Sequence, residues 1–285
     1  MKAIPDYLIH KVKAHIRDEY RNIFSEKMVE SHFNNYILTD LSLAQLKITR
    51  DTTGIKSGQR LCDLGCGYGT FVLVCRQTCI DATGVDLAEY QIKFGRKRMK
   101  YELPNDNISA AYQFGDARNT GMPEKSFDVV SAWNVLEHIK DYDKVIQEAY
   151  RLLKPGGYFV GIAPNYCAFR NEAHYQVPWL PLLPRRLAKF YLQILGKRAD
   201  FFENEIHYVT NWGILKKLRK NGFKNQYYEV LKTGNLDNIN STKIKRILKA
   251  FSDLHLLFLI NFAFLLMNWN PFKPSILFIG QKTYE

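Results

Sequence analysis

Short apolar strands alternate with amphipathic helices between residues 60 and 163, and this alternation limits the possible folds more than any other feature. The strand predicted at residues 127–133 is almost continuously apolar, which is typical of a strand buried on both faces. Such alternation predicts an α/β protein whose parallel sheet is covered by helices. The other predicted strands are 60–64, 82–86, 108–114, 158–163, 223–230 and 275–280, and the predicted helices are 70–79, 88–100, 142–153 and 210–221.

A segment with helical spacing precedes the alternation of strands and helices, and two longer segments interrupt it. Residues 1–56 show apolar residues at helical spacing and are expected to form an N-terminal helical cap. Residues 57–285 are expected to form one domain with two insertions, at 164–206 and 231–274. Long segments without regular alternation are usually functional or disordered, so both insertions are candidates for the substrate side of the molecule.

The positive charge of the chain is confined to its second half. Residues 1–150 hold 20 basic and 20 acidic residues, whereas residues 151–285 hold 20 basic and 8 acidic ones, which accounts for the net charge of +12. A one-sided basic field favours an anionic partner such as a phosphate, a membrane surface or a nucleic acid, and a solvated basic face is the plain alternative. The hydrophobic fraction of 46% excludes a disordered chain.

The five cysteines do not form a disulfide or metal-binding pattern. Four of them lie between residues 62 and 79, but no CxxC pair repeats and no histidine falls between them, so we expect no metal site. The first twenty residues contain no apolar signal core. These features predict a cytoplasmic protein in a reducing compartment.

A glycine-rich segment follows the strand predicted at residues 60–64. Gly65, Gly67 and Gly69 alternate with other residues and lead directly into a helix, so the backbone can turn tightly and approach a ligand. Asp86 ends the next strand and could accept hydrogen bonds from both hydroxyls of a ribose. A dinucleotide fold would place its third glycine one residue later, and Asp63 would repel a pyrophosphate.

The acids at the strand ends point instead to S-adenosylmethionine. Asp63 suits the amine of this cofactor, Asp86 suits its ribose, and Asp116, after the third strand, could accept from its adenine amino group. The ordered segments LCDLGCGYGT, GVDLA, FGDA, FDVVSAWNVLEHI and LLKPGGYFVGIAPN resemble class I S-adenosylmethionine-dependent methyltransferases. The resemblance covers residues 57–163 and resumes at NWGILKKLRKNGF and the last strand.

The resemblance implies a Rossmann-like sheet of seven strands with helices on both faces and an antiparallel last strand. It also implies that ligands bind at the carboxyl ends of the strands. The motif matches assign cofactor contacts to the following residues: Asp63, Gly65, Cys66 and Gly67 at the methionine end, Asp86 and Leu87 at the ribose and adenine, Asp116 and Ala117 at the adenine, and Asn134 near the sulfonium.

His138 is the predicted catalytic base. It lies five residues beyond the fourth strand, in a Leu-Glu-His-Ile segment resembling that of quinone-biosynthesis O-methyltransferases, and its near-neutral pKa suits proton removal. It could also only shape the cofactor pocket. His174 and His207 are alternative bases, and an anionic acceptor would need none.

Several acceptor classes are disfavoured. Asn134 is followed by Val-Leu-Glu rather than by the Pro-Pro-Tyr or Pro-Pro-Phe of adenine and glutamine N-methyltransferases. No Pro-Cys dipeptide occurs, which disfavours the cytosine-C5 class, and Cys66 is interpreted as a packing residue rather than a nucleophile. O-methylation is favoured, and C-methylation stays open.

The two insertions favour an amphiphilic acceptor. Residues 177–198 join Trp, Leu and Pro to a basic amphipathic helix, and residues 243–268 join basic residues to an apolar run too short to span a bilayer. The second segment could be a core helix or lie in a membrane interface, making the protein peripheral to the membrane. An isoprenoid, quinone precursor, lipid-linked sugar or hydrophobic secondary metabolite would suit such walls.

Three other functions compete with this interpretation. The basic C-terminal half could bind RNA as a methyl acceptor, but its charges lie beside Leu and Phe runs rather than in a nucleic-acid module. A non-catalytic protein that binds a membrane or partner would have no need of Asp63, Asp86 and Asp116 together. An NAD-dependent oxidoreductase is disfavoured by the glycine spacing.

Overall fold

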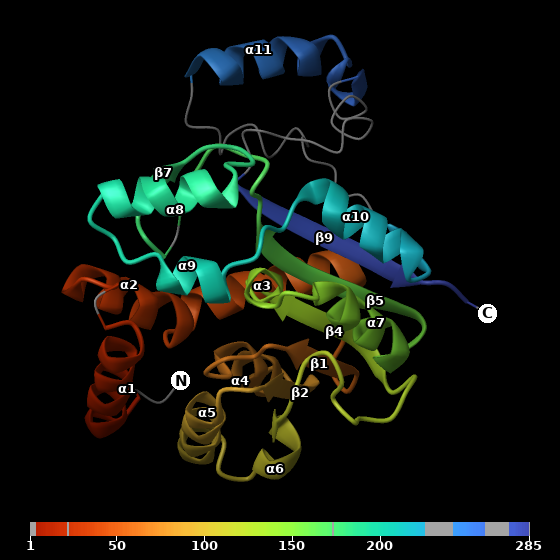
Figure 1. Cartoon of the computed structure of the whole chain (residues 1–285). Coiled ribbons are helices and arrows are strands. Elements are labelled where there is room, and N and C mark those ends of the chain that lie inside the picture. Colours follow the sequence, from red (N-terminus) through yellow and green to blue (C-terminus); the bar gives the residue numbers. More distant parts are fainter. Residues whose placement is uncertain (1–3, 22, 173, 226–241, 260–273, 285) are drawn as a thin grey trace.

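Seven strands form one sheet in the part of the chain that the computed structural model describes, residues 4–21, 23–172, 174–225, 242–259 and 274–284 (Figure 1). Their order is β3-β2-β1-β4-β5-β9-β8, and β9 runs antiparallel to both of its neighbours. The predicted Rossmann-like sheet with an antiparallel last strand is confirmed. The strands are β1 Arg60–Leu64, β2 Asp81–Asp86, β3 Tyr112–Phe114, β4 Phe127–Trp133, β5 Leu153–Pro164, β8 Phe223–Asn225 and β9 Ser275–Lys282.

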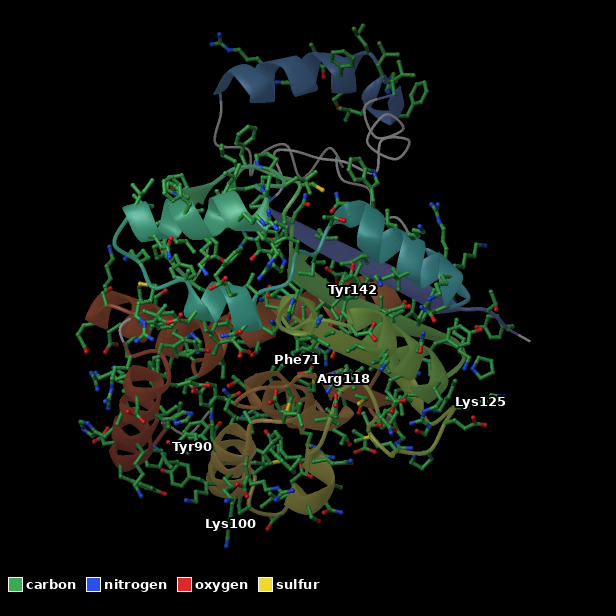
Figure 2. All side chains as sticks on the ribbon, viewed as in Figure 1. Phe71, Tyr90, Lys100, Arg118, Lys125 and Tyr142 are labelled. Carbon is green, nitrogen blue, oxygen red and sulfur yellow. The ribbon has the colours of Figure 1, made fainter. Side chains whose placement is uncertain are left out.

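Alternating side chains of the sheet pack under helices on its two faces. Cys62 and Leu64 of β1 belong to one core cluster, whereas Leu61 belongs to the other, as the two-residue period of a strand requires. Tyr142 and Phe71, labelled in Figure 2, come from helices on these two faces. The helices are α1 Asp6–Glu19, α2 Glu26–Tyr36, α3 Asp40–Thr53, α4 Thr70–Gln77, α5 Glu89–Glu102, α6 Ile108–Ala111, α7 Tyr142–Leu152, α8 Arg185–Ile194, α9 Asp200–Glu205, α10 Asn211–Lys220 and α11 Thr242–Asp253.

The strand register places three strand ends beside one another. Asp63 pairs with Gly84 of β2 and with Ser131 of β4 in parallel ladders. The strand order reverses direction between β1 and β4, because β2 and β3 lie on one side and β5 on the other. A ligand site is expected at the carboxyl ends of the strands at such a switch point.

Two predicted elements differ from the structure, and parts of two other predicted segments are not tested by it. The strand predicted at 108–114 begins only at Tyr112, because the Asn107 side chain accepts from the Ala110 N–H and caps a helical turn there. The strand predicted to begin at 158 already begins at Leu153, whose pairing with Phe127 precedes a register shift. Much of the strand predicted at 223–230 and of the second insertion lies outside the described residues.

The N-terminal helices and residues 164–206 add two smaller cores. α1 and α2 pack against Tyr68 of the glycine segment and Phe94 of α5. The hairpin β6 Arg170–Glu172 and β7 Val177–Trp179 packs with α8 and α9 around Trp179 and Phe202. The boundaries assigned to the cap and the insertions stay predictions. Of the described helices, none has the length and apolar character needed to cross a membrane.

Replacing Arg98 by Met should destabilise the protein, because this buried guanidinium joins the cap to the domain. It donates to the Ile37 carbonyl at 2.5 Å, to Thr70 Oγ1 at 3.1 Å and to Glu102 at 2.6 Å. Breaking such a pair leaves a buried charge and costs about 3–5 kcal/mol. Urea unfolding followed by circular dichroism measures the loss. The double variant Arg98→Met/Glu102→Met should recover part of it, and a wild-type unfolding midpoint for Arg98→Met would contradict this account.

Candidate functional site

A cavity of about 1390 Å³ lies at the carboxyl ends of β1, β2 and β4. Its walls come from the sheet edge, from α1 to α3, and from residues 174–207. Ligand pockets usually measure roughly 300–1,000 Å³, so the cavity can hold more than one small molecule. All ten predicted site residues border it: Asp63, Gly65, Cys66, Gly67, Asp86, Leu87, Asp116, Ala117, Asn134 and His138.

The glycine segment passes under the cavity in a conformation that requires glycine. Gly65 and Gly69 have φ angles of +73° and +74°. A Cβ on Gly65 would overlap the Val135 side chain, and one on Gly69 would overlap the Tyr112 ring. Both positions therefore require a residue without a side chain, and the backbone there can approach a ligand closely.

Asp86 fixes this segment and keeps capacity for a ligand. Its Oδ2 accepts from the Gly67 N–H and its Oδ1 from the Ala88 N–H, both at 2.8 Å. The Leu87 N–H also contributes a hydrogen bond to this carboxylate, which has about four lone-pair sites, so capacity remains for a ribose hydroxyl. The next residue, Leu87, is 58% exposed and offers apolar surface at the cavity wall.

Asp63 is buried at the end of β1 and accepts from Ser131 Oγ at 2.7 Å. Burial raises the pKa of its carboxyl from 3.8 to about 7, and the nearby Asp86 adds to this rise, while the Ser131 hydrogen bond opposes it. A cationic group placed beside Asp63 would favour its charged form. The arrangement suits an amine, as the sequence predicted.

A third acid, Glu19 of α1, borders the same end of the cavity. Burial raises the pKa of the Glu19 and Asp86 carboxyls, and the charge of Asp86 also raises the pKa of Glu19. Among the described residues, no lysine or arginine forms an ion pair with Glu19, Asp63 or Asp86. This end of the cavity therefore favours a cation.

Asp116 borders the cavity, but Arg118 occupies most of its hydrogen-bonding capacity. Its two oxygens accept from Arg118 Nε and Nη2 at distances of 2.6 to 3.0 Å, and Oδ1 also accepts from the Arg118 N–H (Figure 2 labels Arg118). These hydrogen bonds lower the pKa of the Asp116 carboxyl. Of the predicted acids, Asp116 has the least free capacity for an adenine amino group. Its neighbour Ala117 is buried in the core cluster beneath.

Asn134 follows β4 in the left-handed region, with a φ of +53°. Asparagine tolerates this conformation better than most residues, and it is often found at functional sites. The Asn134 N–H donates to the Ile162 carbonyl at 2.7 Å, which holds the residue at the strand end.

Two buried donors at the cavity wall lack partners. Trp133 Nε1 and Tyr68 Oη form no hydrogen bond within the described part of the chain, although both residues line the cavity. Buried polar atoms are nearly always paired, so these two indicate a missing ligand partner. Cys66 offers no nucleophile, because burial raises the pKa of its thiol well above the ordinary value.

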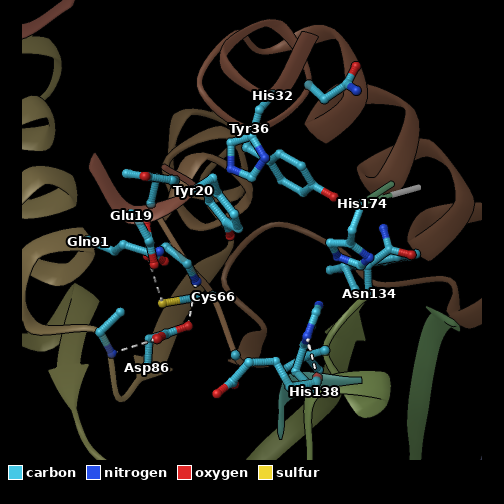
Figure 3. A pocket seen from close by; sticks show the side chains of 18 of the residues that line it. Glu19, Tyr20, His32, Tyr36, Cys66, Asp86, Gln91, Asn134, His138 and His174 are labelled. Atoms are coloured by element: carbon cyan, nitrogen blue, oxygen red, sulfur yellow. Dashed lines mark hydrogen bonds between the residues drawn. The ribbon is translucent and has the colours of Figure 1, made fainter. Parts of the chain in front are cut away.

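His138 lies across the cavity from the acids. Figure 3 shows Glu19 and Asp86 on one side and His138 and His174 on the other. His138 Nδ1 lies 3.0 Å from the Glu205 carbonyl oxygen, which can only accept, so Nδ1 carries the proton. In the neutral ring, Nε2 is then left as the acceptor, as a general base requires.

His174 is oriented by a buried carboxylate. Its Nδ1 lies 3.0 Å from Glu172 Oε1, and Glu172 also accepts from the N–H groups of His174 and Tyr175. The His174 hydrogen bond lowers the pKa of the Glu172 carboxyl against the opposing effect of burial. The rings of His174 and His138 are perpendicular, with centroids 5.1 Å apart.

Aromatic and imidazole rings form the remaining walls of this side. Tyr20, Tyr36 and Phe201 line the cavity with His32, whose pKa burial lowers to about 4. His207, the other alternative base, also borders it, and its pKa is lowered by burial and by Arg185. Both imidazoles are therefore neutral at pH 7. Among the described residues, no three His, Cys, Asp or Glu side chains gather as metal ligands.

Sequence reasoning missed several cavity residues. Glu19, Gln91 and Phe201 come from helices that carry no motif, so only the fold brings them to the site. Glu172 could have been noticed, since it precedes His174 by two residues.

Comparisons with known proteins find methyltransferases that match the central part of the chain. Residues 62–161, about a third of the chain, match the family described as "Methyltransferase domain". Demethylmenaquinone methyltransferase of Listeria welshimeri is 28% identical over 233 residues, covering 72% of this chain and 91% of that protein. The 27-O-demethylrifamycin SV methyltransferase of Amycolatopsis mediterranei is 33% identical over 104 residues, covering 36% of this chain and only 38% of that protein.

Solved structures share the fold at low identity. Phosphoethanolamine N-methyltransferase 2 of Haemonchus contortus, solved with S-adenosyl-L-methionine, gives a TM-score of 0.57 at 21% identity and covers 94% of this chain and 60% of its own. Geranyl diphosphate methyltransferase, also solved with this cofactor, has a TM-score of 0.52 at 18% identity, and the match covers 84% of this chain and 85% of that one. The [4+2]-cyclase SpnF has a TM-score of 0.52 at 17% identity, and the match covers 85% of this chain and 82% of that one.

Replacing Asp63 by Asn should stabilise the ligand-free protein at pH 8. A carboxyl whose folded-state pKa is raised from 3.8 to about 7 favours folding when protonated, and that contribution is lost as the pH rises through about 7. The substituted asparagine cannot ionise, and its amide oxygen can still accept from Ser131. The gain is at most about 4 kcal/mol, because one pKa unit is worth about 1.36 kcal/mol.

Urea unfolding at pH 4 and pH 8 measures this difference. The two proteins should have similar stability at pH 4 and diverge at pH 8. Asp18→Asn, at an exposed position of α1, is the control and should show no such divergence. Equal stability of wild type and Asp63→Asn at pH 8 would contradict the raised pKa.

Proposed function

Because the chain belongs to the class I S-adenosylmethionine-dependent methyltransferases, we propose that it methylates an oxygen atom of a small amphiphilic molecule with a phenolic or quinol-type ring. The observation that carries the proposal is the division of one cavity into two sides. Glu19, Asp63 and Asp86 make one side acidic, and His138 and His174 provide two oriented imidazoles on the other. The names of the relatives, which include demethylmenaquinone methyltransferases, support a ring of this type.

The residues present fit the cofactor. Asp63 would hold its amine and Asp86 its ribose hydroxyls, since each offers a free acceptor where the chain supplies no cation. Gly65 and Gly67, with Cys66 between them, would face the methionine end through bare backbone. Leu87 and Ala117 would pack on the adenine, with Asp116 at its edge, and Asn134 would lie near the sulfonium.

Bound S-adenosylmethionine supplies an electrophilic methyl group, and the chain contributes position and proton removal. With the cofactor bound, the acceptor hydroxyl would lose its proton to His138 Nε2 as its oxygen takes the methyl group, and the S–CH3 bond would break to leave a neutral thioether. The Glu205 carbonyl keeps the His138 proton on Nδ1, so the imidazole needs no rearrangement before it acts. The resulting imidazolium has both nitrogens protonated and returns the added proton to water.

His174 would assist on the same side. Its hydrogen bond to the ionised Glu172 keeps Nδ1 protonated, so Nε2 is also an acceptor. The same contact fixes the orientation of the His174 ring at the cavity wall. One of the two imidazoles can take the proton while the other orients the ring hydroxyl.

The acceptor side of the cavity suits an aromatic molecule with an anionic or polar group. Tyr36 and Phe201 offer ring faces for stacking, and Lys140 and Lys197 also border the cavity. We further propose that the protein is cytoplasmic, because its five cysteines are few and scattered rather than arranged as a disulfide framework.

Methyl-labelled S-adenosylmethionine tests the proposal directly. The purified protein is incubated with the label and either an extract of the source cell or a demethylated quinol, and the products are partitioned between organic and aqueous phases. Label in the organic phase, on an oxygen by mass spectrometry, is expected. Asp86→Ala should remove it. Label confined to the aqueous or macromolecular phase would contradict an amphiphilic acceptor and favour RNA or a sugar, and label on carbon would contradict O-methylation.

His138→Gln should lower kcat by about 10²–10⁴, the usual loss when a general base is removed. Glu172→Gln should lower kcat less, since the carboxylate acts only by orienting His174. His207→Gln is the matched control, because its ring borders the same cavity without such an orienting contact to a carboxylate. Steady-state rates between pH 5.5 and 9 measure these effects. A wild-type rate and profile for His138→Gln would exclude His138 as the base.

A further inference from the structure

The outward face of α8 is apolar where the surface of a globular protein is usually polar. Leu187, Phe190 and Ile194 follow the helical spacing that places residues on one face, and all three are more than half exposed. The opposite face, with Ala188 and Leu192, is buried in the core that α8 shares with Trp179. The helix therefore has an apolar face beyond the one that it needs for folding.

The segment that leads into α8 also exposes apolar side chains. Leu180 and Leu182 lie between β7 and α8, and they and the three helix residues are 50 to 67% exposed. Large contiguous apolar patches are rare on monomeric soluble proteins and usually mark an interaction surface. We name these five residues, Leu180, Leu182, Leu187, Phe190 and Ile194, the α8 patch.

Most of the charges around the α8 patch are positive. Residues 180–199 contain five basic residues and no acidic one. Arg185 keeps its full charge, because its guanidinium donates to the backbone carbonyls of Phe202, Glu203 and Ile206. Two others are partly neutralised by acids of α9: Lys189 pairs with Glu203, and Arg198 pairs with Asp200. The surroundings of the patch remain cationic.

We propose that the α8 patch docks on the surface of an anionic lipid bilayer. A helix with exposed Leu, Phe and Ile and flanking arginines inserts its apolar side at the boundary between headgroups and acyl chains, and its cations attract anionic lipids. This surface differs from the predicted membrane segment at 243–268, of which residues 260–268 lie outside the described part of the chain.

The position of the patch gives it a consequence for the cavity. Tyr175, Val177 and Phe201 pack in the same core as α8 or beside it, and all three line the cavity. Docking would therefore bring the cavity close to the bilayer, where an amphiphilic acceptor resides. This consequence rests on the proposed function, whereas the docking itself does not.

Vesicle sedimentation of the full-length protein tests the docking. Wild type should bind vesicles of phosphatidylglycerol and phosphatidylcholine at least tenfold more tightly than vesicles of phosphatidylcholine alone. The triple variant Leu187→Gln/Phe190→Gln/Ile194→Gln should weaken that binding at least tenfold, and Arg186→Glu should weaken it to a smaller degree. The control is Leu43→Gln/Tyr101→Gln, at two apolar residues that are 42% and 43% exposed outside the α8 patch, and it should bind like wild type.

Two measurements keep the outcomes distinct. Circular dichroism and S-adenosylmethionine binding of the triple variant should match wild type, which separates lost docking from lost folding and from failure of the proposed function. Wild-type affinity for the anionic vesicles in the triple variant would overturn the proposal, as would no binding by wild type. Light scattering that shows a wild-type dimer and a monomeric triple variant, without vesicle binding, would instead make the patch a contact between two copies of the chain.

Discussion

Three carboxyl groups, those of Glu19, Asp63 and Asp86, border one side of a cavity in which burial disfavours their charge. The fold creates this constraint, because the parallel register brings the ends of β1 and β2 together and α1 covers them. Asp86 also holds the glycine segment through the Gly67 N–H, so the carboxylate that we propose for ribose binding also fixes the conformation of this segment. A cationic ligand would stabilise the charged form of these carboxyls. The proposed position of that ligand then determines where the acceptor has to bind.

The opposite side of the cavity is built on another principle. There the imidazoles are oriented by acceptors, a backbone carbonyl for His138 and a carboxylate for His174, so each ring presents its free nitrogen without further adjustment. One acceptor comes from α9 and the other from β6, both within residues 164–206. The same segment thus supplies orienting groups, an aromatic wall and the α8 patch. In the proposed function, the sheet edge holds the cofactor, and residues 164–206 shape the side of the cavity that receives the acceptor.

The sequence was most informative where one physical signal dominated. β1 and β4 were predicted at their observed bounds because their mainly apolar segments end at Gly65 and Asn134. The turn at residues 108–111 was mistaken for strand, because the capping bond of Asn107 outweighs the β-propensity of the segment. All ten predicted site residues border one cavity, but Glu19 and Phe201 reach it through tertiary packing that no local pattern encodes. The pairing of Asp116 with Arg118, two residues later, is local and was overlooked.

The central claim is that buried acids hold a cationic cofactor, and the pH dependence of S-adenosylmethionine affinity tests it most directly. Isothermal titration between pH 5.5 and 8.5 would follow the dissociation constant of wild type and of Asp63→Asn. Only the ionised carboxyl attracts the amine, and the pKa of Asp63 is about 7. Wild-type affinity should therefore weaken below that pH, approaching about tenfold per pH unit for one proton taken up. Asp63→Asn should bind weakly with a flatter profile. Equal affinities and equal profiles for the two proteins would contradict the account.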